Sequence, residues 1–185
     1  MVRKQTDRMA AAAPTDDPAV AGIEAFITQV TAMSRLPASR RRLRRLAQID
    51  THESGIGILM LLSRTGPLSV TDLARHLGVN QSTASRQVAP LEEDGYLTRT
   101  VHPSHRRIQL LALSETGAAA CERAHAVGRR DIAWAIRDWP AEDRTRLSEL
   151  LERFTDTWAE AAIDQGLTPE PMPADHPKAG ASAAE

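Results

Sequence analysis

The stretch that decides the fold is LSVTDLARHLGVNQSTASRQVAPLEEDGYLTR, residues 68–99 of a chain of 185 residues. Ser69 followed by Asp72 predicts the capped start of a short helix. Gly78 predicts its end, because glycine tolerates the left-handed conformation that closes a helix. Asn80 then predicts the N-cap of a second helix, and two short helices joined by a glycine-containing turn indicate a helix-turn-helix. The apolar residues expected to join the two helices are Leu73, Leu77, Val79 and Val88.

A β-hairpin is predicted directly after the second helix. We expect residues 96–101 and residues 108–113 to form its two strands. The polar stretch HPSHRR, residues 102–107, lies between them and predicts a charged tip. A helix-turn-helix followed by such a hairpin is a winged helix-turn-helix.

Further helices are predicted on both sides of this region. Apolar residues recur at helical spacing from Val20 to Met33 and again within residues 140–164, so each segment should carry one apolar stripe. Ser114 predicts the start of a long helix, and Pro140 suits the first turn of the last one. Because a lone winged helix buries little apolar surface, we expect the two stripes to pair in a homodimer.

The helix that precedes the helix-turn-helix is expected to be central. Asp50 followed by Glu53 has the form of a capping box, which predicts a helix start at Thr51. Six apolar residues between Ile56 and Leu62 make this helix apolar on more than one face. The predicted fold class is therefore mainly α with a small β-hairpin wing, a winged helix-turn-helix whose N- and C-terminal helices form a dimerisation region.

The chain divides into five segments, of which the first and last have little apolar surface to bury and are expected to be disordered. The segments are a tail over 1–17, a dimerisation helix with an Arg-rich helix over 18–50, the winged helix-turn-helix over 51–113, dimerisation helices over 114–165, and a Pro- and Ala-rich tail over 166–185. No run approaches eighteen consecutive apolar residues, so we expect no membrane span and a cytoplasmic protein.

The motifs resemble the MarR (multiple antibiotic resistance regulator) family of bacterial transcription factors. The resemblance rests on residues 68–99 with HPSHRRIQLLALSETG, residues 102–117, and is closest over residues 56–117. It implies an obligate homodimer that places recognition helices in successive major grooves of double-stranded DNA and wing tips in the adjacent minor grooves. Two identical recognition helices predict a near-palindromic operator with half-sites about 10 base pairs apart. The resemblance also implies a repressor released by a small-molecule effector, whose identity and contacts the sequence does not give.

The start of the second helix carries the main candidate DNA contacts, because the N-terminal part of a recognition helix meets base edges. Gln can pair with adenine, Arg with guanine, and Ser or Thr hydroxyls with bases or phosphates. The alternative is that these polar side chains do not contact DNA and only form the solvated face of the helix. Pro90 removes one amide hydrogen bond and can tilt or split this helix after Gln87. The candidates are Gln81, Ser82, Thr83, Ser85, Arg86 and Gln87 in the helix, Arg86 foremost, with Arg106 and Arg107 in the wing.

The wing departs from the family pattern Asp-Pro-x-Asp-Arg-Arg, because His102 and His105 replace both acidic residues. In the family the second acidic residue orients the wing arginine, so the orientation of Arg107 is left open, while Arg106 either braces the wing or meets a phosphate. If the two imidazoles lie near phosphates, DNA affinity should be higher at low pH. The alternatives are a solvated loop tip and a His-x-x-His metal site, for which no further ligand cluster is visible. We predict no metal and no cofactor.

The net charge of −1 conceals an uneven distribution of charge. Residues 35–110 carry twelve Lys or Arg side chains and six Asp or Glu, whereas residues 111–185 carry eight and fourteen. The basic region contains the arginine run of residues 40–45, which can face DNA, acidic groups of a partner subunit, or solvent. The candidate phosphate contacts are Ser69, Thr71, Arg40, Arg41, Arg44, His102 and His105.

These features favour a sequence-specific dimeric DNA-binding transcriptional regulator, a repressor of its own or adjacent genes. The alternative is a winged-helix protein-interaction module that has lost DNA binding, for which the altered wing and Pro90 are the reasons. No enzyme is predicted, because the sequence has neither a Gly-rich phosphate loop nor a His-Glu-x-x-His motif. The single cysteine, Cys121, excludes an intramolecular disulfide and is expected to be an inert packing thiol.

Overall fold

The computed structural model describes residues 16–52, 54–102 and 105–164. The tails predicted at the two ends therefore lie almost wholly outside the described residues. The predicted class, mainly α with a small β wing, is confirmed. In chain order the elements are α2 (Pro18–Arg35), α3 (Pro37–Ala47), α4 (Gly55–Thr65), β1 (Leu68–Ser69), α5 (Val70–Leu77), α6 (Gln81–Glu93), β2 (Leu97–His102), β3 (His105–Leu113), α7 (Glu115–Ala135) and α8 (Ala141–Asp164).

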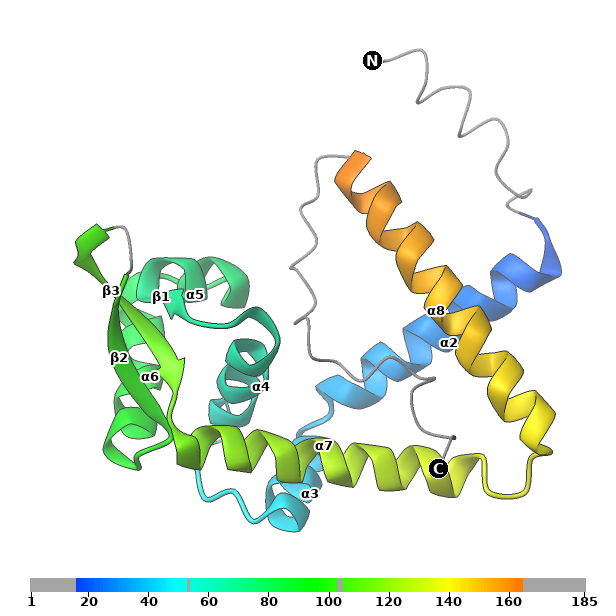
Figure 1. The fold of residues 1–185 in the computed structure, drawn as a ribbon, viewed down its shortest axis with the longest axis horizontal. Helices are drawn as coiled ribbons and strands as arrows, with labels where there is room; N and C mark the ends of the chain where they lie inside the picture. Colours follow the sequence, from blue (N-terminus) through cyan, green and yellow to red (C-terminus); the bar gives the residue numbers. More distant parts are fainter. Residues whose placement is uncertain (1–15, 53, 103–104, 165–185) are drawn as a thin grey trace, which may run out of the picture.

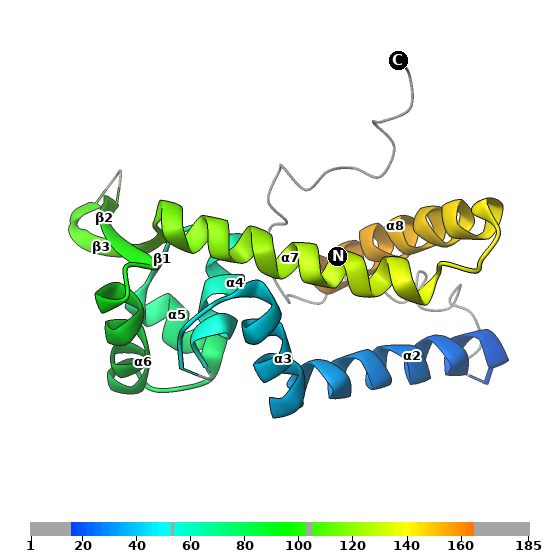
Figure 2. The same ribbon diagram turned by 90° about the horizontal axis from the view of Figure 1, so that it is seen from below.

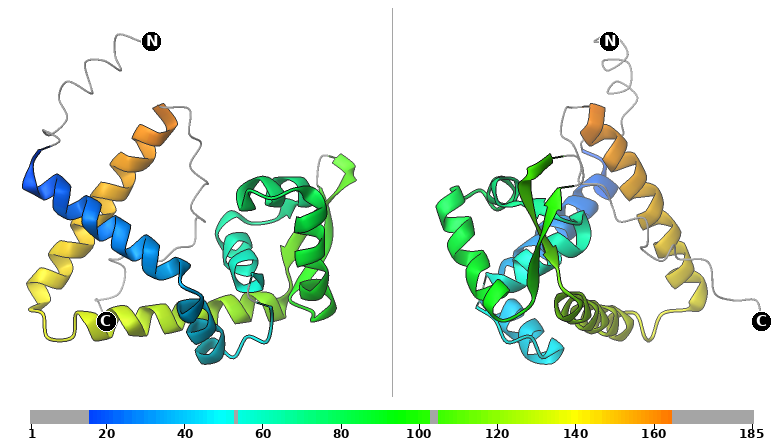
Figure 3. Two further views of the ribbon diagram at one scale, coloured as in Figure 1. Left: turned by 180° about the vertical axis from the view of Figure 1, so that it is seen from behind. Right: turned by 60° about the vertical axis from the view of Figure 1, so that its left-hand side comes forward.

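Two parts of the molecule are joined by the long helix α7 (Figure 1). The lobe consists of α4, α5, α6 and the three strands, and the arm consists of α2 and α8. These two arm helices cross in Figure 1, but Figure 2 shows that they lie on different sides of the arm. The hairpin of β2 and β3, the wing, projects from the side of the lobe away from the arm (Figure 3).

Local sequence signals determine the helix-turn-helix. The Ser69 side chain accepts a hydrogen bond from the amide of Asp72 at 3.1 Å, and α5 ends at Gly78 with φ of 65°. The Asn80 side chain caps α6 by accepting from the amide of Thr83 at 2.8 Å. Both predicted caps and the predicted glycine ending are confirmed, because each depends on contacts within three or four residues.

The core of the lobe lies between α4, the helix-turn-helix, the sheet and the first half of α7. Helix α6 turns Ala84, Val88 and Leu91 inward at helical spacing. Burying three such side chains stabilises the helix-turn-helix by several kcal/mol, at roughly 25 cal/mol per Å² of apolar surface removed from water. The largest fully buried side chains are Ile58, Leu59, Leu73, Leu91, Leu111, Val88 and Cys121.

The sheet has three antiparallel strands in the order β1-β3-β2. β3 is longer than the strand predicted over residues 108–113, because it already begins at His105, which pairs with His102 of β2. The short β1, in which Leu68 pairs with Leu111, was not predicted, since two residues give no periodic signal.

The predicted start of the central helix is wrong. α4 begins at Gly55, and the residues before it are held by tertiary contacts instead of a capping box. The amide of Asp50 donates to the Tyr96 hydroxyl at 3.2 Å, and Thr51 is only 6% exposed. Glu53, the other half of the expected box, lies outside the described residues.

The two prolines behave differently from the expectations. α6 is continuous from Gln81 to Glu93, so Pro90 does not split it, because the buried Val88 and Leu91 hold the turns on either side. Pro140 precedes α8, and its carbonyl accepts a hydrogen bond from the amide of Arg144 at 3.2 Å. It therefore lies one residue before the first turn.

Candidate nucleic-acid interface

Helix α6 presents one polar, exposed face. Gln81, Ser82, Ser85 and Arg86 are exposed, while the residues that pack into the core lie on the opposite side of the helix. Thr83 and Gln87 are half-buried at the edges of this face. The structure thus brings all six helix candidates into the first two turns, with four of them free to meet a ligand.

The first turn of α6 is already organised by hydrogen bonds. Ser82 Oγ donates to Asn80 Oδ1 at 2.7 Å, so its lone pairs remain available while its hydrogen is engaged. Arg86 Nη2 donates to Thr83 Oγ1 at 3.3 Å, a long contact that holds the guanidinium loosely along the helix. Arg86 can therefore leave this contact for a base or phosphate at little cost.

At the start of α5 the two candidate phosphate contacts differ in availability. Ser69 Oγ donates to Asp72 Oδ2 at 2.6 Å and also accepts from the Asp72 amide. The Ser69 hydrogen bond and the nearby Arg75 hold the pKa of Asp72 below its ordinary value, which keeps this carboxylate charged. Ser69 is thus committed to the cap, whereas Thr71 is exposed and better placed for a phosphate.

An ion pair between α6 and the wing was missed at the sequence level. Arg99 Nε and Nη2 donate to Glu92 Oε1 and Oε2 at 2.7 and 3.0 Å, a bidentate geometry. This hydrogen bonding raises the pKa of Arg99. The only signal in the sequence was the spacing of seven residues across the predicted turn at Gly95, which does not by itself bring the two side chains together.

At the wing tip His102 and His105 are partners across the two strands. Their ring centroids are 5.2 Å apart and the rings are tilted by 40°. Arg107 is exposed two positions beyond His105 in β3, where the pairing with β2 shifts register between Val101 and His102. Arg106 belongs to β3, but its side chain lies outside the described part of the structure, as do residues 103–104.

The arginine run of α3 does not act as one surface. Arg42 is bound to Asp131 of α7, which raises the pKa of Arg42 and lowers that of Asp131. Arg40 and Arg41 are exposed, while Arg44 is half-buried, and its Nε atom has no hydrogen-bond partner among the described residues. The run therefore offers Arg40 and Arg41 to an anion and uses Arg42 within the chain.

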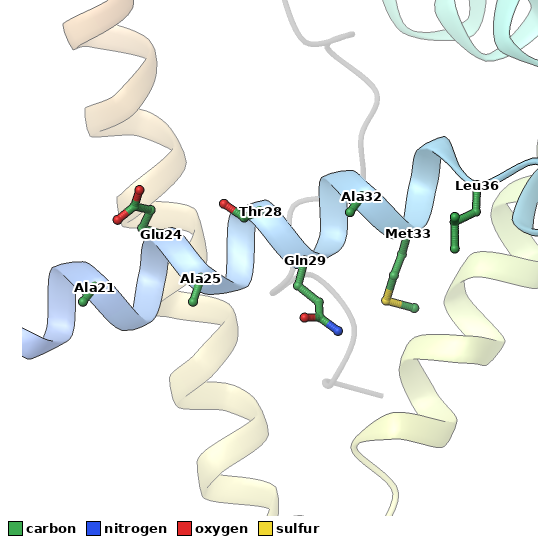
Figure 4. A pocket seen from close by; sticks show the side chains of 8 residues that line it. All are labelled: Ala21, Glu24, Ala25, Thr28, Gln29, Ala32, Met33 and Leu36. Atoms are coloured by element: carbon green, nitrogen blue, oxygen red, sulfur yellow. The ribbon is translucent and has the colours of Figure 1, made fainter.

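The arm carries a hollow of about 630 Å³ along α2. Figure 4 shows that its described lining comes from this one helix, with Gln29 and Met33 projecting from the same side. Phe26 and Met33 are 58% and 54% exposed, and none of the residues of α2 is buried. Such an apolar surface on a single helix needs a cover.

Other chemistry in the described part of the chain is limited. Burial raises the pKa of the Cys121 thiol to about 11, and the side chain is 2% exposed. Among the described residues there is no group of three or more His, Cys, Asp or Glu side chains that could hold a metal ion. None of the described helices is both long and apolar enough to span a bilayer.

The helix-turn-helix of α5 and α6, followed by the hairpin of β2 and β3, places this lobe in the class of winged helix-turn-helix proteins. A sequence model of the MarR family matches residues 53–108. An uncharacterized HTH-type transcriptional regulator of Bacillus subtilis is 26% identical over 120 residues, which span 60% of this chain and 84% of that protein. Residues 53–108 therefore match the MarR family, and the predicted resemblance is confirmed.

Solved structures share the fold over a larger part of the chain. A transcriptional regulator of Thermotoga maritima superposes with a TM-score of 0.62 at 24% identity, covering 77% of this chain and 97% of that one. A MarR family protein from Bacillus stearothermophilus gives 0.62 at 18% identity, covering 79% and 99%. FabT of Streptococcus pneumoniae, solved in complex with DNA, gives 0.53 at 16% identity, covering 77% and 99%. The arm helices thus belong to the shared fold.

Proposed function

We propose that this protein is a sequence-specific, dimeric DNA-binding transcriptional regulator that represses its own or adjacent genes. The observation that carries the proposal is the exposed polar face of α6, with Gln81, Ser82, Ser85 and Arg86 on the outside of a rigid helix-turn-helix. These side chains match the donors and acceptors of base edges in the major groove. The MarR-family match and the DNA complex of a protein of the same fold support this assignment.

Exposed side chains outside α6 also lie where they could contact the proposed DNA. Arg107 and His105 are exposed on the wing, and Thr71 is exposed at the start of α5. Helix α6, the start of α5 and the wing all belong to the lobe (Figure 1). We infer that α6 enters a major groove while the wing reaches the adjacent minor groove.

A homodimer accounts for the apolar surface of the arm. On α8 the side chains of Leu150, Leu151 and Trp158 are 37%, 44% and 61% exposed in the single chain. Contiguous exposed apolar surface of this kind marks an interaction site. Pairing α2 and α8 of two copies would cover it and would place two copies of α6 on a near-palindromic operator.

We also propose that a small-molecule effector releases the protein from DNA. A second copy would close the hollow along α2 into a site between the arm and the lobe, and a ligand there could change the spacing of the two recognition helices. Such a ligand acts only if it binds one spacing more tightly than the other.

A salt titration tests DNA binding against the alternative, a winged-helix interaction module that has lost it. The probe is a mixed-sequence duplex of about 30 base pairs, long enough for two half-sites. A DNA-binding protein loses affinity with a log-log slope of about 0.9 for each phosphate neutralised. Absence of binding even at low salt would exclude the regulator and leave the interaction module.

Light scattering after size exclusion tests the dimer. Replacing Phe26 on the exposed face of α2 by Lys should yield a monomer, because a charge in the paired stripe would be buried without a partner. Replacing Thr31, an exposed residue of the same helix that does not line the hollow, by Lys serves as the control for the added charge. A monomeric wild-type chain at micromolar concentration would contradict the proposed assembly.

A further inference from the structure

We propose that Glu92 is a positioning residue that sets the wing at a fixed angle to the recognition helix by its ion pair with Arg99. This inference rests on the proposed DNA-binding function and deepens it. Glu92 lies in the last turn of α6, and Arg99 lies in the middle of β2. The two hydrogen bonds of 2.7 and 3.0 Å fix both the distance and the relative orientation of the groups.

The position of Arg99 along β2 explains why this contact matters. Arg99 lies two residues after the buried Leu97, so both side chains project from the same face of β2. The residue opposite Arg99 on β3 is the fully buried Leu111. Farther out on the strand, Thr100 and Val101 are exposed. The pair therefore lies at the point where the wing leaves the core, and movement there is magnified at the tip that carries His102 and His105.

Simultaneous contact with two grooves depends on this angle. If α6 and the wing are held rigidly, the second contact forms at the effective concentration set by the first. If the wing can swing, part of that advantage is lost to ordering the wing on the DNA. Glu92 would thus raise affinity without touching the nucleic acid.

The sign of one substitution separates this proposal from simple charge effects. Glu92→Gln removes a negative charge beside a polyanion and frees Arg99, so long-range electrostatics alone predicts tighter binding. Loss of positioning predicts weaker binding. Glu93→Gln is the matched control, because Glu93 is an exposed carboxylate on the same turn and the charge change is identical.

The experiment measures fluorescence anisotropy on a duplex of about 30 base pairs, recovered by selection from random sequence with the wild-type chain. Glu92→Gln should weaken binding about fivefold, the factor that corresponds to an exposed ion pair near the upper end of its range. Its salt slope should fall by about 0.9 if one wing phosphate contact is lost. Glu93→Gln should bind as tightly as the wild type or slightly more tightly, with an unchanged slope.

Three further variants separate positioning from folding and from direct contact. Glu92→Gln combined with Arg99→Gln should bind no more weakly than the weaker single variant, because both remove the same interaction. Glu92→Arg combined with Arg99→Glu should restore part of the affinity and the slope. Melting curves by circular dichroism confirm that each variant is folded, and Glu92→Asp, which keeps the charge at a shorter reach, should be intermediate.

The outcomes are distinct. If the wild-type chain selects no duplex, the proposed function fails and this inference fails with it. If the wild type binds but Glu92→Gln binds as tightly as Glu93→Gln, the regulator stands and the positioning role of Glu92 is overturned.

Discussion

Arg42 on α3 and Asp131 on α7 are joined by two parallel hydrogen bonds, with Nη1–Oδ2 at 2.6 Å and Nη2–Oδ1 at 2.8 Å. The pair ties the Arg-rich helix to the helix that links lobe and arm. One of the five arginines in the run therefore meets an acidic group of its own chain, an alternative that the sequence did not suggest. Arg123 adds a second link, since its Nε donates to the carbonyl of Ala47 at 2.8 Å.

The Arg42–Asp131 pair should make stability depend on pH below neutrality. The pKa of Asp131 is lowered in the folded chain, so its contribution is present above the ordinary carboxylate range and is lost as pH falls through the lowered value. Asp131→Asn should lower the melting temperature at pH 7 by no more than about 2 °C, since both side chains are exposed. The difference from the wild type should vanish near pH 3, and a difference that persists there would contradict the assignment.

The helix-turn-helix could be predicted because its signals are local. Ser69, Gly78 and Asn80 each act on amides or dihedral angles within one turn, and the structure repeats those contacts. The start of α4 failed for the opposite reason. There the hydroxyl of Tyr96, 46 positions away, accepts a hydrogen bond from the amide of Asp50. No local sequence pattern predicts such a contact.

The candidate site was only partly predictable for the same reason. The polar face of α6 follows from helical periodicity, and the exposure of Arg86 confirms that it lies on the surface. The hydrogen bond from Ser69 to the Asp72 carboxylate depends on side-chain rotamers. The Glu92–Arg99 pair depends on how β2 packs against α6. Composition and spacing do not determine those features.

Two glycine substitutions should change stability in opposite directions. A Cβ at Gly117 would collide with the carbonyl oxygen of Tyr96, which is backbone and cannot move aside. Gly117→Ala should therefore lower the free energy of unfolding by about 1–3 kcal/mol. Gly57→Ala, in the interior of α4 with no atom within 4 Å of the new Cβ, should raise it by up to about 1 kcal/mol. Urea denaturation measures both, and equal shifts would refute the predicted collision.

The thiol of Cys121 should be unreactive in the folded chain. It is buried against α4, with Sγ 3.5 Å from the carbonyl oxygen of Leu59, and burial raises its pKa to about 11. Since the thiolate is the reactive form, an aromatic disulfide reagent at pH 8 should modify Cys121 only as fast as the chain unfolds. Because the pKa is raised, the wild type should lose stability relative to Cys121→Ala as pH rises toward 11. Rapid modification of native protein would show that the thiol is accessible.

The histidine pair should make DNA affinity depend on pH. A phosphate close to an imidazole favours the protonated form of the ring, so DNA binding should take up protons. At low pH two imidazolium groups would add two positive charges to a wing that already carries the exposed Arg107. Affinity should therefore be about two- to tenfold higher at pH 6 than at pH 8, present at low pH and lost as the rings deprotonate.

The double variant His102→Gln with His105→Gln tests this origin of the pH dependence. The variant should bind equally at the two pH values, and His125→Gln, on α7 and away from the wing, is the control. If the wild type and the double variant show the same pH dependence, the histidines do not contact the DNA and the wing tip is only solvated.

Arg86 should contribute more to sequence specificity than to general affinity for DNA. It is exposed on the outer face of α6 and only loosely held by Thr83, so it can form two hydrogen bonds to a guanine edge. Arg86→Ala should weaken binding to a selected duplex by about 1–3 kcal/mol, while binding to a mixed-sequence duplex changes much less. Arg41→Ala, which removes an exposed arginine of α3, should weaken both to a similar and smaller extent if it meets only a phosphate. Equal losses on both duplexes for Arg86→Ala would assign Arg86 to the phosphate backbone and leave base recognition to Gln81 and Ser85.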